Sequence, residues 1–150
     1  MTTVNLVDII TGISQLTFTG INTRDIDAVP EDVESLCPLF CPRLDKFLTN
    51  PRFTRQSFGA ANEARMDWDY DLTWLYYHAP LADNIDWLSF YGEMFTGLAV
   101  IAAKFFSTNP VTGAVEMILQ DIPDIAVLKD VVGKEYHGVE ITIHIKEFVN

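Results

Sequence analysis

One segment, residues 66–77, restricts the fold of this chain more than any other. Apolar side chains, most of them aromatic, occupy every second position: Met66, Trp68, Tyr70, Leu72, Trp74 and Tyr76. Alternation of this kind predicts a β-strand, and aromatic residues are favoured in strands. The intervening positions begin with aspartates, so we expect a strand with one buried face and one polar face.

Two helices are predicted, one on each side of this strand in the sequence. Apolar residues at intervals of three and four predict the first over residues 3–17, with Thr2 or Thr3 as its N-cap. A second helix of about 22 residues follows Asp83 or Asn84 and ends at residues 107–110, which include a proline. Further strands are expected over residues 52–58, 114–120, 125–129 and 138–148.

The order of these elements predicts one α+β domain. The chain has 150 residues, the length of a single domain, and we assign residues 1–150 to it. Helices and strands neither alternate regularly nor separate into two blocks. This order favours a mainly antiparallel sheet with two helices packed on it.

The second helix is apolar on more than one side. One stripe of apolar residues at helical spacing runs from Leu88 to Phe105, and the other faces also carry large apolar side chains. A helix that is apolar nearly all round is buried on more than one side. In a chain this short, we predict that the second side contacts a neighbouring subunit, through Trp87, Phe90, Met94 and Ile101.

Residues 20–50 lack any periodicity and contain prolines at positions 30, 38 and 42. Proline is excluded from helix interiors and central strands, so this segment is predicted to form a long irregular arm. Such segments are usually functional or wrap around a partner. The candidate partner contacts lie in the arm and in the basic stretch that follows it: Leu36, Leu39, Phe40, Arg43, Arg52 and Arg55.

The basic stretch has two interpretations. Arginines and lysines between positions 43 and 65 flank Phe47, Phe53 and Phe58. Basic residues interleaved with aromatic ones are typical of contact with an acidic partner protein or with passing nucleic acid. The alternative is an ordinary charged loop that balances an acidic domain.

The chain is strongly acidic, with a formal net charge of −11. This charge opposes wrapping of nucleic acid and binding to anionic lipid, because phosphates are repelled. The densest acidic cluster is Asp67, Asp69 and Asp71, which resembles the start of a calcium-binding loop. That loop requires glycine and glutamate where this chain has Leu72 and His78, so we expect a solvated acidic stripe.

No recognised catalytic or cofactor-binding motif is present in the sequence. A nucleophile elbow, a phosphate-binding loop and a dinucleotide-binding loop are all absent. The histidines have no carboxylate or cysteine partner at a recognised spacing. Cys37 and Cys41 lack a second pair, which favours small apolar residues over a metal or redox pair. We expect no enzymatic activity, no cofactor and no bound metal.

No targeting or membrane segment is predicted. Residues 1–15 lack the basic region and apolar stretch of a signal peptide. The longest apolar run, residues 94–103, is shorter than the roughly 20 residues of a spanning helix. We therefore expect synthesis in the cytoplasm and no membrane association.

The order of landmarks along the chain resembles the tail terminator family of long-tailed bacteriophages. The landmarks are the first helix, the proline-containing run 36–43, the Phe58-Gly59 step before the aromatic strand, the long apolar helix, and the hairpin 128–138 before a final alternating strand. The resemblance implies a structural virion protein of the tail or neck. Copies of such a protein form a homohexameric ring that binds the tail tube protein at the end of the tube and caps the tube. The ring later joins the head–tail stopper or connector, and DNA passes through it.

The resemblance also implies roles for the predicted features. In such a ring the two-sided helix and the arm contact neighbouring subunits, while Asp67, Asp69 and Asp71 line the channel or its rim. An electronegative channel does not grip DNA. The alternatives are another neck protein, a stopper or adaptor, and a small α+β enzyme or ligand-binding domain. The last would require a pocket with converging polar groups that include His78 and Asp71.

Overall fold

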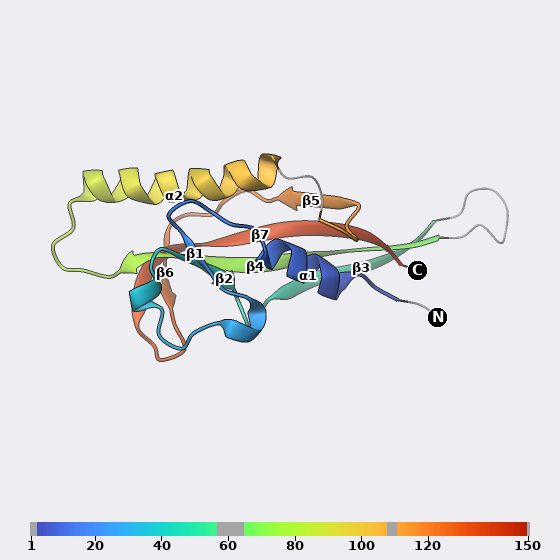
Figure 1. Ribbon diagram of the computed structural model, residues 1–150, viewed down its shortest axis with the longest axis horizontal. Coiled ribbons are helices and arrows are strands. Elements are labelled where there is room, and N and C mark those ends of the chain that lie inside the picture. The colour runs from blue at the N-terminus through green and yellow to red at the C-terminus, as the bar shows by residue number, and fades with distance from the viewer. Residues whose placement is uncertain (1–2, 57–64, 108–110, 150) are drawn as a thin grey trace.

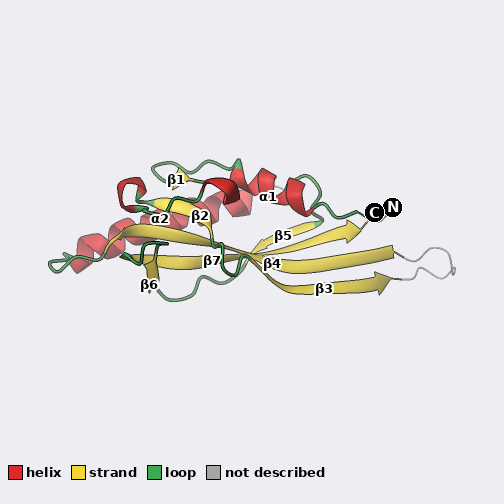
Figure 2. Cartoon of the chain, turned by 90° about the horizontal axis from the view of Figure 1, so that it is seen from below, coloured by secondary structure: helices red, strands yellow, loops and turns green. Residues whose placement is uncertain are grey.

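The computed structural model, an α+β fold, describes residues 3–56, 65–107 and 111–149. The helices α1 (Leu6–Ser14) and α2 (Trp87–Ser107) lie on the same face of a curled sheet (Figure 1 and Figure 2). Short 3-10 helices, η1 (Ile26–Ala28) and η2 (Glu34–Leu36), connect the first two strands. The strands are β1 (Asn22–Thr23), β2 (Leu39–Pro42), β3 (Leu48–Gln56), β4 (Arg65–Pro80), β5 (Glu116–Leu119), β6 (Ala126–Lys129) and β7 (Glu135–Val149).

Strands β4 and β7 form the centre of the sheet. They pair antiparallel along most of their length, from Met66 opposite Val149 to Pro80 opposite Tyr136. The other edge of β4 pairs with β3 and β2, and the other edge of β7 pairs with β5 and β6. The sheet therefore has β3 and β2 along one side and β5 and β6 along the other.

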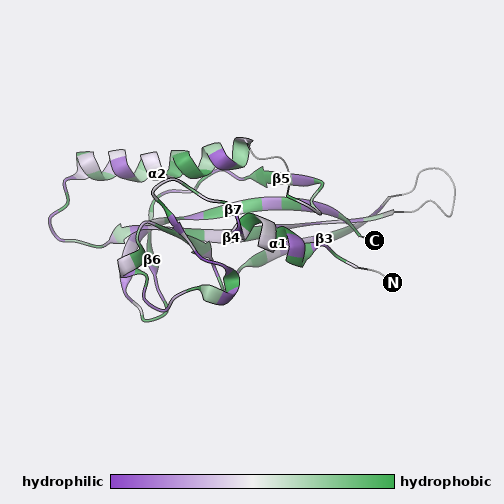
Figure 3. Cartoon of the chain, viewed as in Figure 1, coloured by the Kyte–Doolittle hydropathy of each residue, from purple (hydrophilic) through white to green (hydrophobic). Residues whose placement is uncertain are grey.

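The main core lies between this sheet and the helices. Side chains that alternate along β4 and β7 are buried there, and hydrophobic stretches follow the middle of α2 and much of β7 (Figure 3). The strand predicted over residues 66–77 is confirmed and extends to both sides. The core side chains of the sheet and helices are Trp68, Tyr70, Leu72, Trp74, Tyr76, Ile141, Ile143, Ile145, Ile9, Ile13, Phe90, Met94, Leu98, Ile101 and Phe105.

A buried carboxylate attaches the start of α1 to the sheet. Glu147 of β7 is fully buried and accepts hydrogen bonds from the backbone N–H of Asn5 at 2.7 Å and from Tyr70 Oη at 2.7 Å. Burial, together with the hydrogen bond and the charge of Glu147, raises the pKa of Tyr70, which keeps this phenol protonated as a donor. The N-terminal helix is therefore held against the C-terminal strand.

Two expectations about the fold are wrong. The sheet is mixed instead of mainly antiparallel, because β1 runs parallel to β2 after the crossover through η1 and η2. Residues 20–50 do not form an irregular arm, because they contain β1, β2 and the start of β3 and pack against the sheet. The prolines do not prevent this: Pro38 precedes β2 and Pro42 ends it, and proline is tolerated at strand ends.

The predicted element boundaries differ from the observed ones at several ends. Helix α1 is shorter than predicted, and Asn5 stands at its N-cap position. Helix α2 and the later strands lie where they were predicted, with β7 beginning earlier, at Glu135. Thr2, the Phe58-Gly59 step and the predicted end of the second helix at residues 108–110 lie outside the described residues.

Candidate functional site

Gly97 determines how α2 packs on the sheet. A Cβ atom at this position would lie 2.2 Å from Oη of the buried Tyr76, so only glycine allows this contact without a shift of the helix or the ring. The buried residues of α2 are Phe90, Met94, Leu98, Ile101 and Phe105. The same helix face therefore carries both the close approach and the core side chains.

A second apolar face of α2 is exposed. Leu88 is 86% exposed, Phe106 77%, Phe95 53% and Tyr91 49%. Together with two alanines these residues follow one another at intervals of three or four, so they lie along one side of the helix. We call this set the outer stripe: Leu88, Tyr91, Phe95, Ala99, Ala102 and Phe106. None of its side chains is charged.

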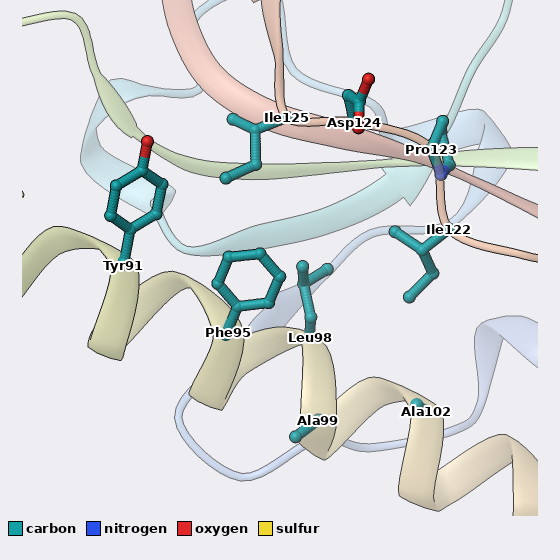
Figure 4. A pocket seen from close by; sticks show the side chains of 9 residues that line it. All are labelled: Tyr91, Phe95, Leu98, Ala99, Ala102, Ile122, Pro123, Asp124 and Ile125. Carbon is teal, nitrogen blue, oxygen red and sulfur yellow. The ribbon is translucent and has the colours of Figure 1, made fainter.

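A groove lies beside the outer stripe, between α2 and the connection from β5 to β6 (Figure 4). Phe95 and Leu98 point from the helix toward Ile122 and Ile125, whereas the carboxylate of Asp124 points away from the helix. The volume of this outer groove is about 630 Å³. Its lining is Tyr91, Phe95, Leu98, Ala99, Ala102, Ile122, Pro123, Asp124 and Ile125. The groove thus has an apolar interior and an acidic rim.

The intersubunit face predicted for this helix is wrong for most of its residues. Phe90, Met94 and Ile101 are buried against the sheet of their own chain. Trp87, the remaining member of that set, is 52% exposed beside the outer stripe. Both apolar faces repeat at helical spacing, so the pattern alone does not tell which face meets the sheet.

The acidic residues of β4 lie on the sheet face away from the helices. Asp67 is 1% exposed, so the prediction that it faces a channel or rim is wrong. Asp69 and Asp71 are partly exposed. In the register of the sheet, Asp69 stands between Arg52 of β3 and Lys146 of β7. Cross-strand neighbours of opposite charge reduce the negative charge of this stripe.

Asp71 is the centre of the best-defined polar cluster. Its Oδ1 lies 2.8 Å from His144 Nδ1, and its Oδ2 accepts a hydrogen bond from Asn50 Nδ2 at 3.0 Å. Asn50 has a φ of 54° at the bulge where β3 shifts its register against β4. Next along the same face, the hydroxyls of Thr73 and Thr142 lie 3.3 Å apart. These contacts tie three strands together on the open face of the sheet.

His78 lies apart from this cluster. Its Nδ1 is 2.9 Å from Tyr76 Oη, on the helix-facing side of β4, whereas Asp71 lies on the opposite side. His78 and Tyr76 line a second cavity of about 490 Å³ together with Glu93 and Thr96 of α2. Burial lowers the pKa of His78. The structure therefore does not bring His78 and Asp71 together in one pocket.

Most of the predicted partner contacts in residues 36–43 are occupied within the chain. Leu39 and Phe40 of β2 are buried, and Leu36 is partly buried. Arg43 pairs with Glu140 of β7 across the sheet. These side chains hold β2 against the sheet, so their prediction as a free partner-binding arm is wrong.

Arg52 and Arg55, in contrast, are exposed on β3. They stand on either side of Phe53, which is 57% exposed and stacks on Trp68 with ring centroids 5.0 Å apart. Within the part of the chain that the structure describes, neither arginine forms an ion pair. We call these three residues, Arg52, Phe53 and Arg55, the basic edge.

The two cysteines are free thiols. Burial raises the pKa of Cys37 to about 11 and that of Cys41 to about 12. Among residues 3–56, 65–107 and 111–149, no three histidine, cysteine or carboxylate side chains are grouped as metal ligands. Neither described helix is both long and apolar enough to cross a membrane.

No protein-family model matches this chain, and no curated protein is significantly similar to it in sequence. The candidate site is therefore defined by its geometry. It consists of the outer stripe, the outer groove and the basic edge.

Two parts of this site were missed from the sequence. The sequence predicts an apolar stripe through Leu88 and Phe95 but does not place this stripe on the outside of the molecule. The wall from Ile122 to Ile125 gave no signal, because its position depends on where β5 and β6 pair with β7. Glycine gave no clear signal either, because α2 contains two glycines and only Gly97 lies against the sheet, whereas Gly92 has nothing within 4 Å of a Cβ position.

Proposed function

We propose that this chain is a structural subunit of the tail terminator type, which forms a ring with copies of itself at the end of a phage tail tube. The observation that carries this function is the outer stripe, an uncharged apolar surface on a chain of net charge −11, together with the apolar interior of the groove beside it. The ring meets the tail tube protein on one side and the head–tail stopper or connector on the other. DNA passes through its centre.

The exposed apolar area of α2 supports contact with a second copy. With about 200 Å² of surface per large side chain, the exposed fractions of Trp87, Leu88, Tyr91, Phe95 and Phe106 amount to roughly 600 Å². The largest apolar patch on a typical monomer is about 300–600 Å². Each partner in a standard interface buries about 800 Å². The patch, enlarged by the groove, therefore approaches the area that stable self-association requires.

The acidic charge supports a channel that DNA crosses without being held. A net charge of −11 repels phosphates, so it opposes capture of DNA during its passage. Asp69 and Asp71, which are partly exposed, remain the candidates for the channel surface. Asp67 is excluded because it is buried.

The proposed function is tested with tail tubes. Tubes polymerised from the tail tube protein are mixed with the wild-type chain and viewed by negative-stain electron microscopy. We expect capped ends and tubes that stop growing. Leu88→Glu is the matched variant for comparison. This side chain is 86% exposed, so the change places a charge in the outer stripe without touching the core. Bare, growing tube ends with the wild-type chain would contradict the function and favour another neck role.

A small ligand-binding domain is the second candidate function. The cavity beside His78, Tyr76 and Glu93 favours it, because apolar walls and a few polar groups converge there. Small-molecule screening by thermal shift tests this alternative. A ligand that stabilises the wild-type chain but not the His78→Phe variant would support it.

A further inference from the structure

We propose that copies of this chain join head to tail, with the basic edge of β3 in one copy seated in the outer groove of the next. This contact rests on the proposed ring and identifies the two surfaces that build it. The occupant of the groove is therefore a second copy of the same chain.

The two surfaces lie at opposite edges of the sheet. The basic edge belongs to β3, which pairs with β4. The groove wall, residues 122–125, connects β5 and β6, which pair with the far edge of β7. Figure 2 shows β3 and β6 at well-separated positions along the sheet. Contact between two different surfaces of identical chains is heterologous, and repetition of such a contact closes into a ring when the rotation allows it.

The chemistry of the two surfaces is complementary. Phe53 presents an exposed aromatic ring, and the groove presents apolar walls from Phe95, Leu98 and Ile122. An aromatic anchor that enters an apolar pocket, with arginine nearby, is the usual composition of an interface hot spot. The register of β3 places Phe53 opposite Trp68, whose ring lies on the helix-facing side of the sheet.

The charges at the margins of the two surfaces are opposite. Arg52 and Arg55 flank Phe53 in the sequence of β3, with Arg55 on the same face as Phe53 and Arg52 on the face of Asp69. Asp124 lies at the rim of the groove, and Asp121 is exposed three residues before it. Copies of a chain with net charge −11 repel one another. Association is favoured where exposed cations meet carboxylates. The basic edge and the acidic rim provide that arrangement.

Paired charge reversal tests this contact. Variant one carries Arg52→Asp and Arg55→Asp, and variant two carries Asp121→Arg and Asp124→Arg; all of these side chains are exposed. We expect each variant alone to self-associate at least about 100-fold more weakly than the wild type. We expect an equimolar mixture to recover rings, because each reversed surface then meets its complement. Analytical ultracentrifugation measures all three samples.

Two controls separate the contact from general charge and folding effects. Lys46→Asp with Lys129→Asp gives the same net charge as variant one at exposed positions outside both surfaces, and it should assemble like the wild type. Urea unfolding of every variant checks that the fold is retained.

The outcomes distinguish this contact from the ring itself. If wild-type rings form and either variant alone also assembles, or if the mixture fails to recover rings, the head-to-tail contact is wrong and the ring function stands. If the wild-type chain remains monomeric both in solution and on tail tubes, the ring function fails and this contact fails with it.

Discussion

Replacement of Gly97 by alanine tests which face of α2 packs on the sheet. The added methyl group would lie 2.2 Å from Tyr76 Oη and 3.0 Å from its Cζ, inside the core. In a helix interior, alanine is more favourable than glycine by about 1 kcal/mol. An extra carbon in a packed core costs about 1–3 kcal/mol. Because the contact involves the buried ring itself, we expect overpacking to exceed the gain in helix propensity. Gly97→Ala should lower the free energy of unfolding by up to about 2 kcal/mol.

Gly92→Ala is the matched control in the same helix. A Cβ atom at Gly92 would meet nothing within 4 Å, so only helix propensity acts there. This variant should gain roughly 0.5–1 kcal/mol of stability. Removal of Oη by Tyr76→Phe should reduce the cost of the Gly97→Ala change, since the closest contact disappears.

Urea unfolding followed by tryptophan fluorescence measures these free energies. In thermal unfolding, each kcal/mol corresponds to a shift in melting temperature of about 2–4 °C. Equal stabilisation by Gly92→Ala and Gly97→Ala would refute the packing described here. Gly97 would then not face Tyr76, and the outer stripe of α2 would not be the exposed face.

Other predictions concern the buried polar groups. Tyr70→Phe removes one donor to Glu147 and should cost about 1–3 kcal/mol in urea unfolding, and an unchanged midpoint would contradict this role. Because burial lowers the pKa of His78, the unfolded state binds more protons, so stability should fall as the pH drops below about 6.5. His78→Gln should reduce this pH dependence, and identical pH profiles would refute it. Burial raises the pKa of Cys37 to about 11 and that of Cys41 to about 12. Both thiols should therefore be alkylated slowly at about pH 8 until the chain unfolds, as mass spectrometry can measure; rapid modification of native Cys41 would contradict its burial.

Local periodicity was sufficient to predict most of the elements. The alternation that begins at Met66 reports a strand with one buried face, and β4 buries that face as predicted. The apolar residues around Phe95 likewise predict a long helix. These signals are local, because the side chains of one element are positioned by its own backbone geometry.

The features that depend on pairing between distant segments could not be predicted in this way. Asp69 was read as part of an acidic surface, but Lys146 and Arg52 stand beside it through pairings with β7 and β3. The parallel pairing of β1 with β2 has no periodic signal, since β1 contains only Asn22 and Thr23. Pairing between distant strands therefore places cations beside Asp69 and makes the sheet mixed, and neither result is visible in local periodicity.

The sequence does not show which of the two apolar faces of α2 packs on the sheet, and this prevents a correct prediction of the candidate site. The stripe through Met94 and the stripe through Phe95 both repeat at helical spacing. Hydrophobicity does not distinguish them. The structure does, because Gly97 lies against Tyr76 whereas a Cβ atom at Gly92 would meet nothing within 4 Å. The intersubunit face was consequently assigned to residues that the sheet already covers.

The solution mass of the wild-type chain beside that of Phe95→Asp tests the central claim most directly. Phe95 is 53% exposed within the outer stripe, so an aspartate there leaves the core intact and places an unpaired charge in the contact. Ring formation through this face predicts a ring-sized species for the wild type and a monomer for the variant, with similar unfolding midpoints. Ring-sized species of equal mass from both proteins would contradict it.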